Sequence, residues 1–320
     1  MSTRLYTPRF LTGTSVSRAM GRYIAAQLFP IRTTQRQAGF LAEIDKADTM
    51  LRMVDYSMNP GTTAPKVAVE LSRDNTFYCQ KYGVSYPVTD EMVANADEEA
   101  RELVTNGGAW TVEILKRHRE KQFVDFLAAA FTGNQTSSPS TKWNNSNGTP
   151  IPDIRGKARE ISSEYGVRPN ALGLDVSTLD AIMENDDTKD RIIQTLPPGQ
   201  QANGIEQQAQ ILATLLGFDS VFVAEGAVIN TAAEGQTKSL STIWGENVFM
   251  CRVEPIRIGT QATGCHVAWN GTTTGGIIEG FRVKEVRHED TDSTDVEARA
   301  YYDQLGLQTE GGHLFTNTLE

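Results

Sequence analysis

The apolar residues of this chain recur at helical spacing in five segments. The longest segment runs from Asp97 to Phe131, and at 1.5 Å per residue it predicts a helix of about 52 Å. Its acidic start suits the positive end of a helix dipole, and Gly107-Gly108 is expected to bend it. Four shorter helices are predicted at Ser15–Leu28, Ile154–Tyr165, Ser177–Met183 and Ile205–Leu216. Ser177 is expected to cap the third of these, and Gly166 and Gly217 to end the second and fourth.

Short apolar runs predict strands between and after these helices. Ala171–Leu174 and Ser220–Ala224 read as buried strands, and the polar segment Thr132–Pro150 between two helices reads as a loop or a small hairpin turning at Asn147-Gly148. Three further strands are predicted in the C-terminal third, at Val267–Trp269, Gly276–Glu285 and Val296–Tyr302. This mixture and order of elements predicts an α+β fold.

A long extended segment precedes the longest helix. Apolar residues alternate weakly at Leu51 and Met53 and again in Val67–Leu71, with the turn signal Asn59-Pro60-Gly61 between them. The pattern predicts a long hairpin with its tip in Met58–Thr63. A two-stranded hairpin has little core of its own, so we expect it to pack on another subunit. The contact residues predicted at its tip are Met58, Asn59, Pro60 and Gly61.

Charge is distributed unevenly along the chain. Six arginines and no acidic residue precede Glu43, whereas the complete chain has 30 basic and 40 acidic residues. An arginine-rich, acid-poor start is typical of a mitochondrial presequence, but it also fits an ordered arm that lies on an acidic surface. We favour the arm, which could contact a neighbouring subunit or face DNA. The contact residues predicted for it are Arg18, Arg22, Arg32 and Arg36.

Two polar segments have alternative interpretations. Glu285–Glu297 holds six carboxylates in thirteen residues; it is either a solvated turn between strands or the docking surface for a neighbour's basic arm, through Glu289, Asp290 and Asp292. Lys116–Gln122, inside the longest predicted helix, is expected to be a solvated face, since nearby acidic residues disfavour a nucleic-acid contact there.

Motifs for catalysis, cofactors and metals are missing from the sequence. There is no phosphate-binding glycine loop, zinc-protease motif or nucleophile elbow, and Glu184–Asp190 lacks the glycine and final glutamate of a calcium loop. Cys265 and His266 are adjacent, which would point them to opposite faces of a strand. Three cysteines without CxxC spacing indicate a reducing compartment, and no apolar run approaches the ~18 residues of a membrane span. We therefore expect no enzyme, no cofactor, no metal and no membrane contact.

The order of these elements resembles a known family. The stretch "YCQKYGVSYPVTDEMVANAD" leads into the long helix, and Pro169-Asn170 precedes a short strand and a helix. Then "LLGFDSVFV" (Leu215–Val223) steps from helix to strand, and Trp244-Gly245 precedes an apolar strand. Over nearly the whole chain, this order resembles the major capsid proteins of tailed bacteriophages, which have the Hong Kong 97-type fold.

The resemblance implies a division of the chain. Residues 1–36 would form the N-terminal arm, 37–86 the extended loop, 87–166 the peripheral domain with its spine helix, 167–264 the axial domain, and 265–320 a return into the peripheral domain. Lys46 and Lys66 lie in the extended loop, where some members of the family form crosslinks, but the sequence identifies no asparagine partner for either.

The resemblance also implies a function. The chain would be a structural protein that assembles, as hexamers and pentamers, into the icosahedral head of a tailed phage around double-stranded DNA. Because the extended loop begins so early, no scaffolding segment fits before it, which implies a separate scaffolding protein. A portal protein, a possible decoration protein and weak, non-specific DNA contact complete the expected partners, in a virion assembled in the bacterial cytoplasm. The alternatives are an encapsulin that loads cargo enzyme, an unrecognised enzyme and a mitochondrial protein.

Overall fold

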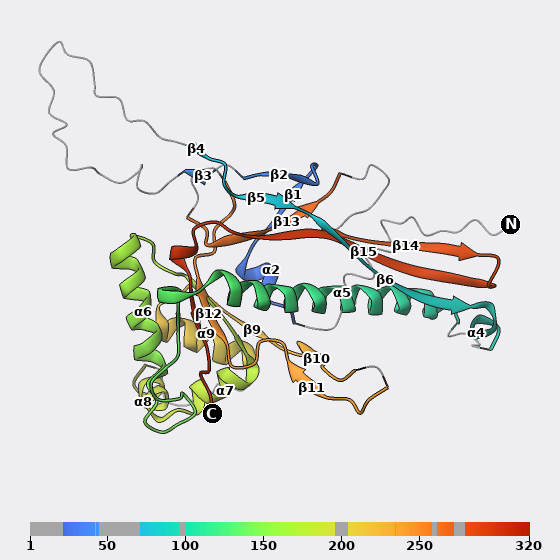
Figure 1. Cartoon of the computed structure of the whole chain (residues 1–320). Helices are drawn as coiled ribbons and strands as arrows, with labels where there is room; N and C mark the ends of the chain where they lie inside the picture. The colour runs from blue at the N-terminus through green and yellow to red at the C-terminus, as the bar shows by residue number, and fades with distance from the viewer. Residues whose placement is uncertain are drawn as a thin grey trace, which may run out of the picture.

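The computed structural model describes residues 22–41, 43–44, 71–95, 100–195, 204–233, 235–257, 261–271 and 279–320. Two five-stranded sheets joined by one long helix form the frame of these residues (Figure 1). No helix within these ranges is long and apolar enough to cross a membrane. Several predicted features lie outside them, namely the start of the first helix with Arg18, the loop lysines Lys46 and Lys66, and the hairpin tip with Met58, Asn59, Pro60 and Gly61.

The first sheet is built around one long strand, β15. It consists of β1 (Ile31–Thr34), β6 (Gln80–Thr89), β13 (Gly264–Trp269), β14 (Phe281–His288) and β15 (Ser293–Gly306). β15 pairs antiparallel with both β14 and β6, and its end pairs with β13. The predicted C-terminal strands are confirmed, but β15 is longer than expected because its pairing continues from the acidic turn to Gly306.

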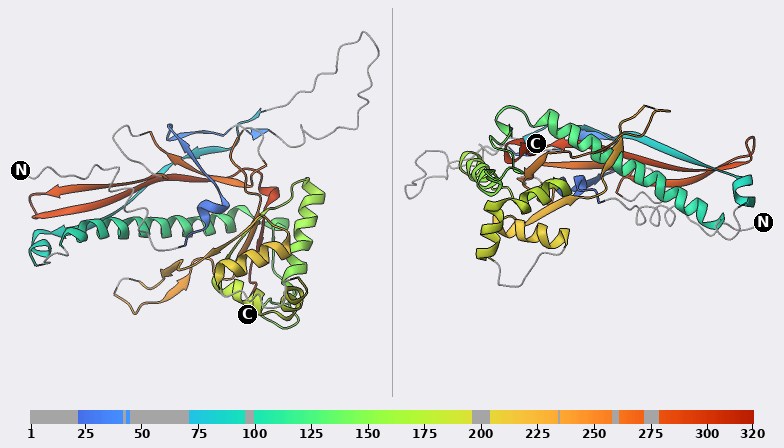
Figure 2. Two further views of the ribbon diagram at one scale, coloured as in Figure 1. Left: turned by 180° about the vertical axis from the view of Figure 1, so that it is seen from behind. Right: turned by 90° about the horizontal axis from the view of Figure 1, so that it is seen from below.

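Helix α5 (Ala100–Ala130) runs along one face of this sheet and reaches the second one (Figures 1 and 2). Its 31 residues correspond to about 46 Å, which confirms the long helix, and α4 (Asp90–Asn95) is a separate short helix before it. Val112 and Leu115 pack on the first sheet, whereas Phe123 packs on the second. The helix therefore holds the two sheets together.

Gly107 allows α5 to approach strand β6 closely. The helix is continuous through Gly107-Gly108. A Cβ on Gly107 would lie 2.8 Å from Cδ1 of Tyr86 on β6, so the glycine lets the helix pack tightly against that strand.

The second sheet is covered by helices on both faces. Its strands, in order, are β7 (Thr136–Ser137), β16 (His313–Phe315), β12 (Val248–Cys251), β8 (Ala171–Asp175) and β9 (Ser220–Ala224). The helices of this lobe are α6 (Pro150–Tyr165), α7 (Val176–Glu184), α8 (Asp186–Thr195) and α9 (Ile205–Leu216). α6, α7 and α9 share one core with the sheet, whereas α2 (Ala25–Leu28) and the end of α5 share the other.

This double cover explains the uninterrupted apolar runs of the sequence. In β12, Val248 and Met250 face the core under α6 and α9, while Phe249 and Cys251 face the core under α2 and α5. A strand buried on both faces needs apolar residues at every position, and all four residues of β12 are fully buried.

The observed ends of the helices can be compared with those predicted from the sequence. Gly166 (φ +66°) and Gly217 (φ +71°) end α6 and α9 in the left-handed conformation, as predicted. The predicted cap at Ser177 is wrong, because the carboxylate of Asp175 caps α7, accepting hydrogen bonds from the Ser177 N–H (3.3 Å) and hydroxyl (2.8 Å). α8 begins at Asp186, so Asp186–Asp190 of the acidic segment Glu184–Asp190 are helical.

The predicted solvated face Lys116–Gln122 is also wrong. Arg119 is 5% exposed and Glu120 is 1% exposed. They lie where α5 passes from the first sheet to the second, so neighbouring elements cover both sides of the helix. The Arg119 guanidinium carbon lies 5.0 Å from the centre of the Phe281 ring, and Glu120 contacts α2.

Three two-stranded ribbons leave the main sheets. β2 (Ala38–Phe40) pairs antiparallel with β5 (Thr76–Tyr78), and β3 (Glu43–Ile44) with β4 (Leu71–Ser72), as the two legs of the predicted hairpin require. β10 (Val228–Asn230) pairs with β11 (Leu240–Thr242) beside the second sheet. The segment predicted as a loop contains the short helix η1 (Gly133–Gln135) and β7, and η2 (Thr309–Gly311) precedes β16.

Replacing Gly173 of β8 by valine is expected to reduce the free energy of unfolding by about 2 kcal/mol. A Cβ at this position would lie 2.4 Å from Cδ1 of Leu28 and 3.2 Å from Cδ1 of Ile24, so the added methyl groups would push α2 off the sheet. Urea denaturation of the full chain measures the effect. Gly156→Ala on α6 is the matched control, because a Cβ there meets nothing within 4 Å; a Gly173→Val protein as stable as the native chain would contradict the packing of α2.

Candidate intersubunit surfaces

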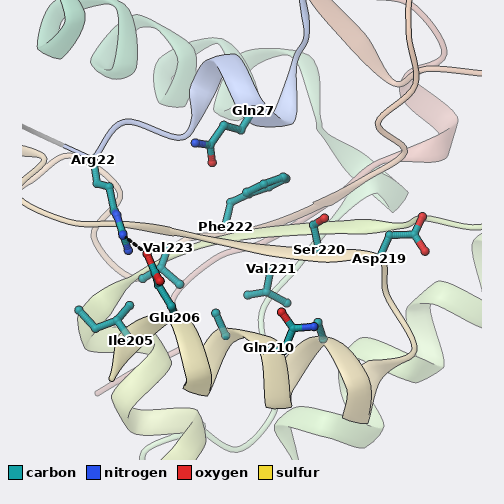
Figure 3. A pocket seen from close by; sticks show the side chains of 12 residues that line it. Arg22, Gln27, Ile205, Glu206, Gln210, Asp219, Ser220, Val221, Phe222 and Val223 are labelled. Carbon is teal, nitrogen blue, oxygen red and sulfur yellow. Dashed lines mark hydrogen bonds and ion pairs between the residues drawn. The ribbon is translucent and has the colours of Figure 1, made fainter. Parts of the chain in front are cut away.

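The described part of the basic arm begins at Arg22, at the rim of a cavity of about 430 Å³ between α2, α9 and β9. The guanidinium of Arg22 pairs with the carboxylate of Glu206, and its backbone exchanges hydrogen bonds of 3.0 and 3.2 Å with Glu225 (Figure 3). Val221 and Phe222 point to opposite sides of β9 in the same view. Arg22 thus uses its charge within its own subunit, and its contact with a neighbour stays a prediction.

Glu120 fastens the arm to α5. Its carboxylate accepts hydrogen bonds from the N–H groups of Ile24 (3.1 Å) and Ala25 (3.0 Å), and from Nε1 of Trp244 (2.6 Å). Burial raises the pKa of Glu120, while these three donors favour its charged form. α2 has no capping side chain of its own, so Glu120 supplies the acceptor that the first N–H groups of the helix need.

Tyr23 and His266 hold the same segment from two other sides. The Tyr23 hydroxyl bonds to the Glu113 carboxylate on α5, and burial raises its pKa. His266 of β13 donates from Nε2 to the carbonyl of Ala25 (3.1 Å), and burial lowers its pKa to about 3. The segment from Arg22 to Ala25 is therefore held by α5 and by both sheets. Sequence reasoning missed these contacts, because Glu113, Glu120 and His266 are far in the sequence from the arm residues that they bind.

The other described arginines of the arm lie on the first sheet. Arg32 pairs with Val267 in the parallel ladder of β1 and β13, and Arg36 follows the end of β1. Both residues are exposed, and neither forms an ion pair within the part of the chain that the structure describes. The contact of these two arginines with a neighbouring subunit stays a prediction.

The acidic turn lies at the tip of the β14–β15 hairpin. Glu289, Asp290 and Asp292 are exposed, as the interpretation of a solvated turn requires. Arg287 pairs bidentately with Asp90 (both 2.6 Å), which lowers the pKa of Asp90, and it lies 3.9 Å from Asp292. The tip is at the end of the molecule remote from α2 (Figure 1), so a contact between the turn and the described arm residues around α2 needs a second subunit.

Exposed apolar side chains mark two further surfaces. Phe40 (48% exposed) and Tyr78 (57%) lie on the outer face of the β2–β5 ribbon, whose opposite face buries Phe77. Trp110 and Ile114, one turn apart on α5, are each about half exposed. Contiguous apolar exposure of this kind is typical of interaction surfaces.

The double replacement Phe40→Asp and Tyr78→Asp is expected to abolish assembly while changing the free energy of unfolding of the subunit by less than about 0.5 kcal/mol. Both side chains are half exposed in the single chain, so their loss costs little there, whereas charges would be buried in a contact between subunits. Mass photometry and urea denaturation measure the two quantities. Lys81→Asp, on the neighbouring strand β6, is the control; normal particles from the double variant would exclude this surface.

Chemically reactive clusters are few among the described residues. No group of three or more His, Cys, Asp or Glu side chains within them is placed to hold a metal ion. All three cysteines are free and buried, and burial raises the pKa of the Cys79 thiol to about 12.

The three-dimensional structure has clear counterparts, although no protein-family model and no curated protein matches the sequence. A phage-related protein from Bordetella bronchiseptica matches with a TM-score of 0.69 at 15% identity, covering 99% of each chain. An encapsulin complex from Synechococcus elongatus matches at 0.55 and 12%, covering 99% of this chain and 90% of the other. The capsid of cyanophage P-SCSP1u matches at 0.54 and 10%, covering 90% and 86%.

These matches define the class of fold. The chain has the α+β Hong Kong 97-type capsid fold. Coverage of nearly the whole length on both sides means that this chain and the phage-related protein share the complete arrangement and not one lobe of it.

Proposed function

We propose that this chain is the major capsid protein of a tailed phage, which assembles into an icosahedral head around double-stranded DNA. The observation that carries the proposal is the match of the whole fold to phage-related and capsid chains, at 99% coverage in the best case reported above. The role is structural, with no catalytic residue, cofactor or metal.

The partners follow from this role. Copies of the chain form hexamers and pentamers, with a separate scaffolding protein during assembly, a portal protein at one vertex and, on some shells, a decoration protein. The net charge of −10 keeps contact with the packaged DNA weak and independent of sequence. The assembled protein resides in the virion, and assembly takes place in the cytoplasm of the bacterial host.

An encapsulin-type shell that loads cargo enzyme is the second candidate. The observation in its favour is the coverage of 99% of this chain by the encapsulin match, at a TM-score equal to that of the cyanophage capsid within 0.01. The higher TM-score of the phage-related protein, 0.69 against 0.55, favours the phage head.

The contents of native particles separate the two candidates. Particles containing this chain are isolated from the source cells, treated with nuclease and analysed for protected nucleic acid and for co-purifying proteins. The phage head predicts nuclease-protected double-stranded DNA together with a portal protein. Particles that hold a single cargo enzyme and no protected DNA would overturn the phage role in favour of the encapsulin.

A further inference from the structure

One face of α6 carries a row of arginines and serines. Arg155, Arg159 and Ser162 follow one another at spacings of four and three residues, which places them on the same side of the helix. Ser163 flanks this row, and Arg168 approaches it from the segment after the helix. The row faces the carboxyl end of α9; both helices can be found in Figure 1.

These side chains line a cavity of about 420 Å³ between α6 and the last turn of α9. Its apolar floor is formed by Ala158 and Leu216, which are 6% and 1% exposed. The polar lining consists of three guanidinium groups and two hydroxyl groups. This volume is within the usual range for sites that hold small molecules or parts of larger ligands.

The three arginines of this cavity have no acidic partner. Within the described ranges, Arg155, Arg159 and Arg168 form no ion pair, although the chain has ten more acidic than basic residues. Glu160 pairs with Lys157 at 2.8 Å. Glu164 is two and a half turns from Arg155, so it lies on the opposite side of α6. The cavity is therefore a basic site on an acidic protein.

Helix dipoles account for only part of this arrangement. Arg168 lies beside the carboxyl end of α9, with Nη2 3.2 Å from where a Cβ of Gly217 would be, and a cation is favourable there. Arg155 and Arg159 are the sixth and tenth of the sixteen residues of α6, away from either carboxyl end. Both side chains are exposed, so water solvates them in the single chain, and an anion from outside can replace that water at the cavity.

The donors select the kind of anion. A carboxylate can occupy one guanidinium fork, whereas a phosphate offers more acceptor oxygens and can bridge several donors. We propose that this cavity binds phosphate groups of the DNA backbone, which makes α6 a DNA-facing element of the shell. The proposal rests on the proposed function for the presence of DNA, but the binding itself can be measured on the unassembled chain.

The test is the salt dependence of binding to a short labelled DNA duplex, measured by fluorescence anisotropy from about 50 to 200 mM salt. The double replacement Arg155→Gln and Arg159→Gln is expected to weaken binding at every salt concentration and to reduce the slope of log K against log[salt] by about 2. The double replacement Lys189→Gln and Lys238→Gln changes the net charge equally at exposed positions outside the cavity, and is expected to leave the slope unchanged. Arg155→Lys with Arg159→Lys should restore the slope.

The outcomes separate this inference from the proposed function. DNA binding that is equal in the native chain and the arginine-to-glutamine variant would overturn the inference, whether or not shells form. If that variant also failed to assemble, the cavity would hold an acidic surface of a second copy instead. Inorganic phosphate that binds the cavity, with DNA affinity unaffected by the two arginines, would restrict the site to small phosphates and equally overturn the DNA contact.

Discussion

Replacing Glu120 by alanine is expected to reduce the free energy of unfolding by about 3–5 kcal/mol. The substitution removes the carboxylate that accepts hydrogen bonds from the Ile24 and Ala25 N–H groups and from the Trp244 indole, all of which are buried. It also removes negative charge beside the buried Arg119. α2 and the arm residues next to it would lose their contact with α5, so we expect assembly to fail together with stability. Urea denaturation and mass photometry measure the two effects.

Two further variants test whether this effect comes from the hydrogen bonds of Glu120 to the arm and to Trp244. Glu120→Gln keeps one acceptor oxygen and the volume, so it should cost about 1–3 kcal/mol, less than the alanine variant. Asp125→Ala removes an exposed carboxylate that pairs with Lys121 on the same helix, and should cost less than about 1 kcal/mol. Glu120→Ala within 0.5 kcal/mol of Asp125→Ala would refute the anchoring role.

Acidification is expected to destabilise the subunit through His266. The residue is 1% exposed, and burial lowers its pKa to about 3 from an ordinary value of 6.5. Below pH 6.5 the imidazole of His266 binds a proton in the unfolded chain but not in the folded chain. The free energy of unfolding therefore falls as the pH falls. The slope approaches about 1.4 kcal/mol per pH unit, and the loss between pH 6.5 and 4.5 is about 2 kcal/mol.

Other buried groups modify this pH dependence. His313, whose pKa is lowered to about 4, acts in the same direction as His266, whereas the raised pKa of Glu120 favours the folded state as the pH falls. The His266→Gln variant isolates the contribution of His266. The free energy of unfolding of this variant should change less between pH 6.5 and 4.5 than that of the native chain. His288→Gln, at an exposed position, is the control. Parallel pH curves for the native chain and His266→Gln would show that His266 does not carry the effect.

Elements whose signals are local could be predicted from the sequence. Gly166 and Gly217 ended their helices where predicted because a left-handed residue after a helix favours glycine whatever surrounds it. β8 and β9 were recognisable since strands buried on both faces read as short apolar runs. The long helix was recognisable from its apolar spacing over 31 residues.

Elements that depend on partners far away in the sequence could not be predicted from it. Glu120 looked like part of a solvated face, because its three donors come from residues about 95 and 124 positions away. The cap of α7 fell on Asp175 rather than Ser177, a choice between two good capping residues that the backbone geometry decides. The basic cavity was missed for the same reason, because Leu216 of α9, which closes it, is far from Arg155 and Arg168 in the sequence.

The central claim, that copies of this chain close into a shell, is tested most directly by mass photometry and negative-stain electron microscopy of the purified chain, alone and with the products of neighbouring genes. The account predicts hexamer and pentamer rings or closed shells of uniform diameter. A chain that stays monomeric or dimeric under all of these conditions would contradict it.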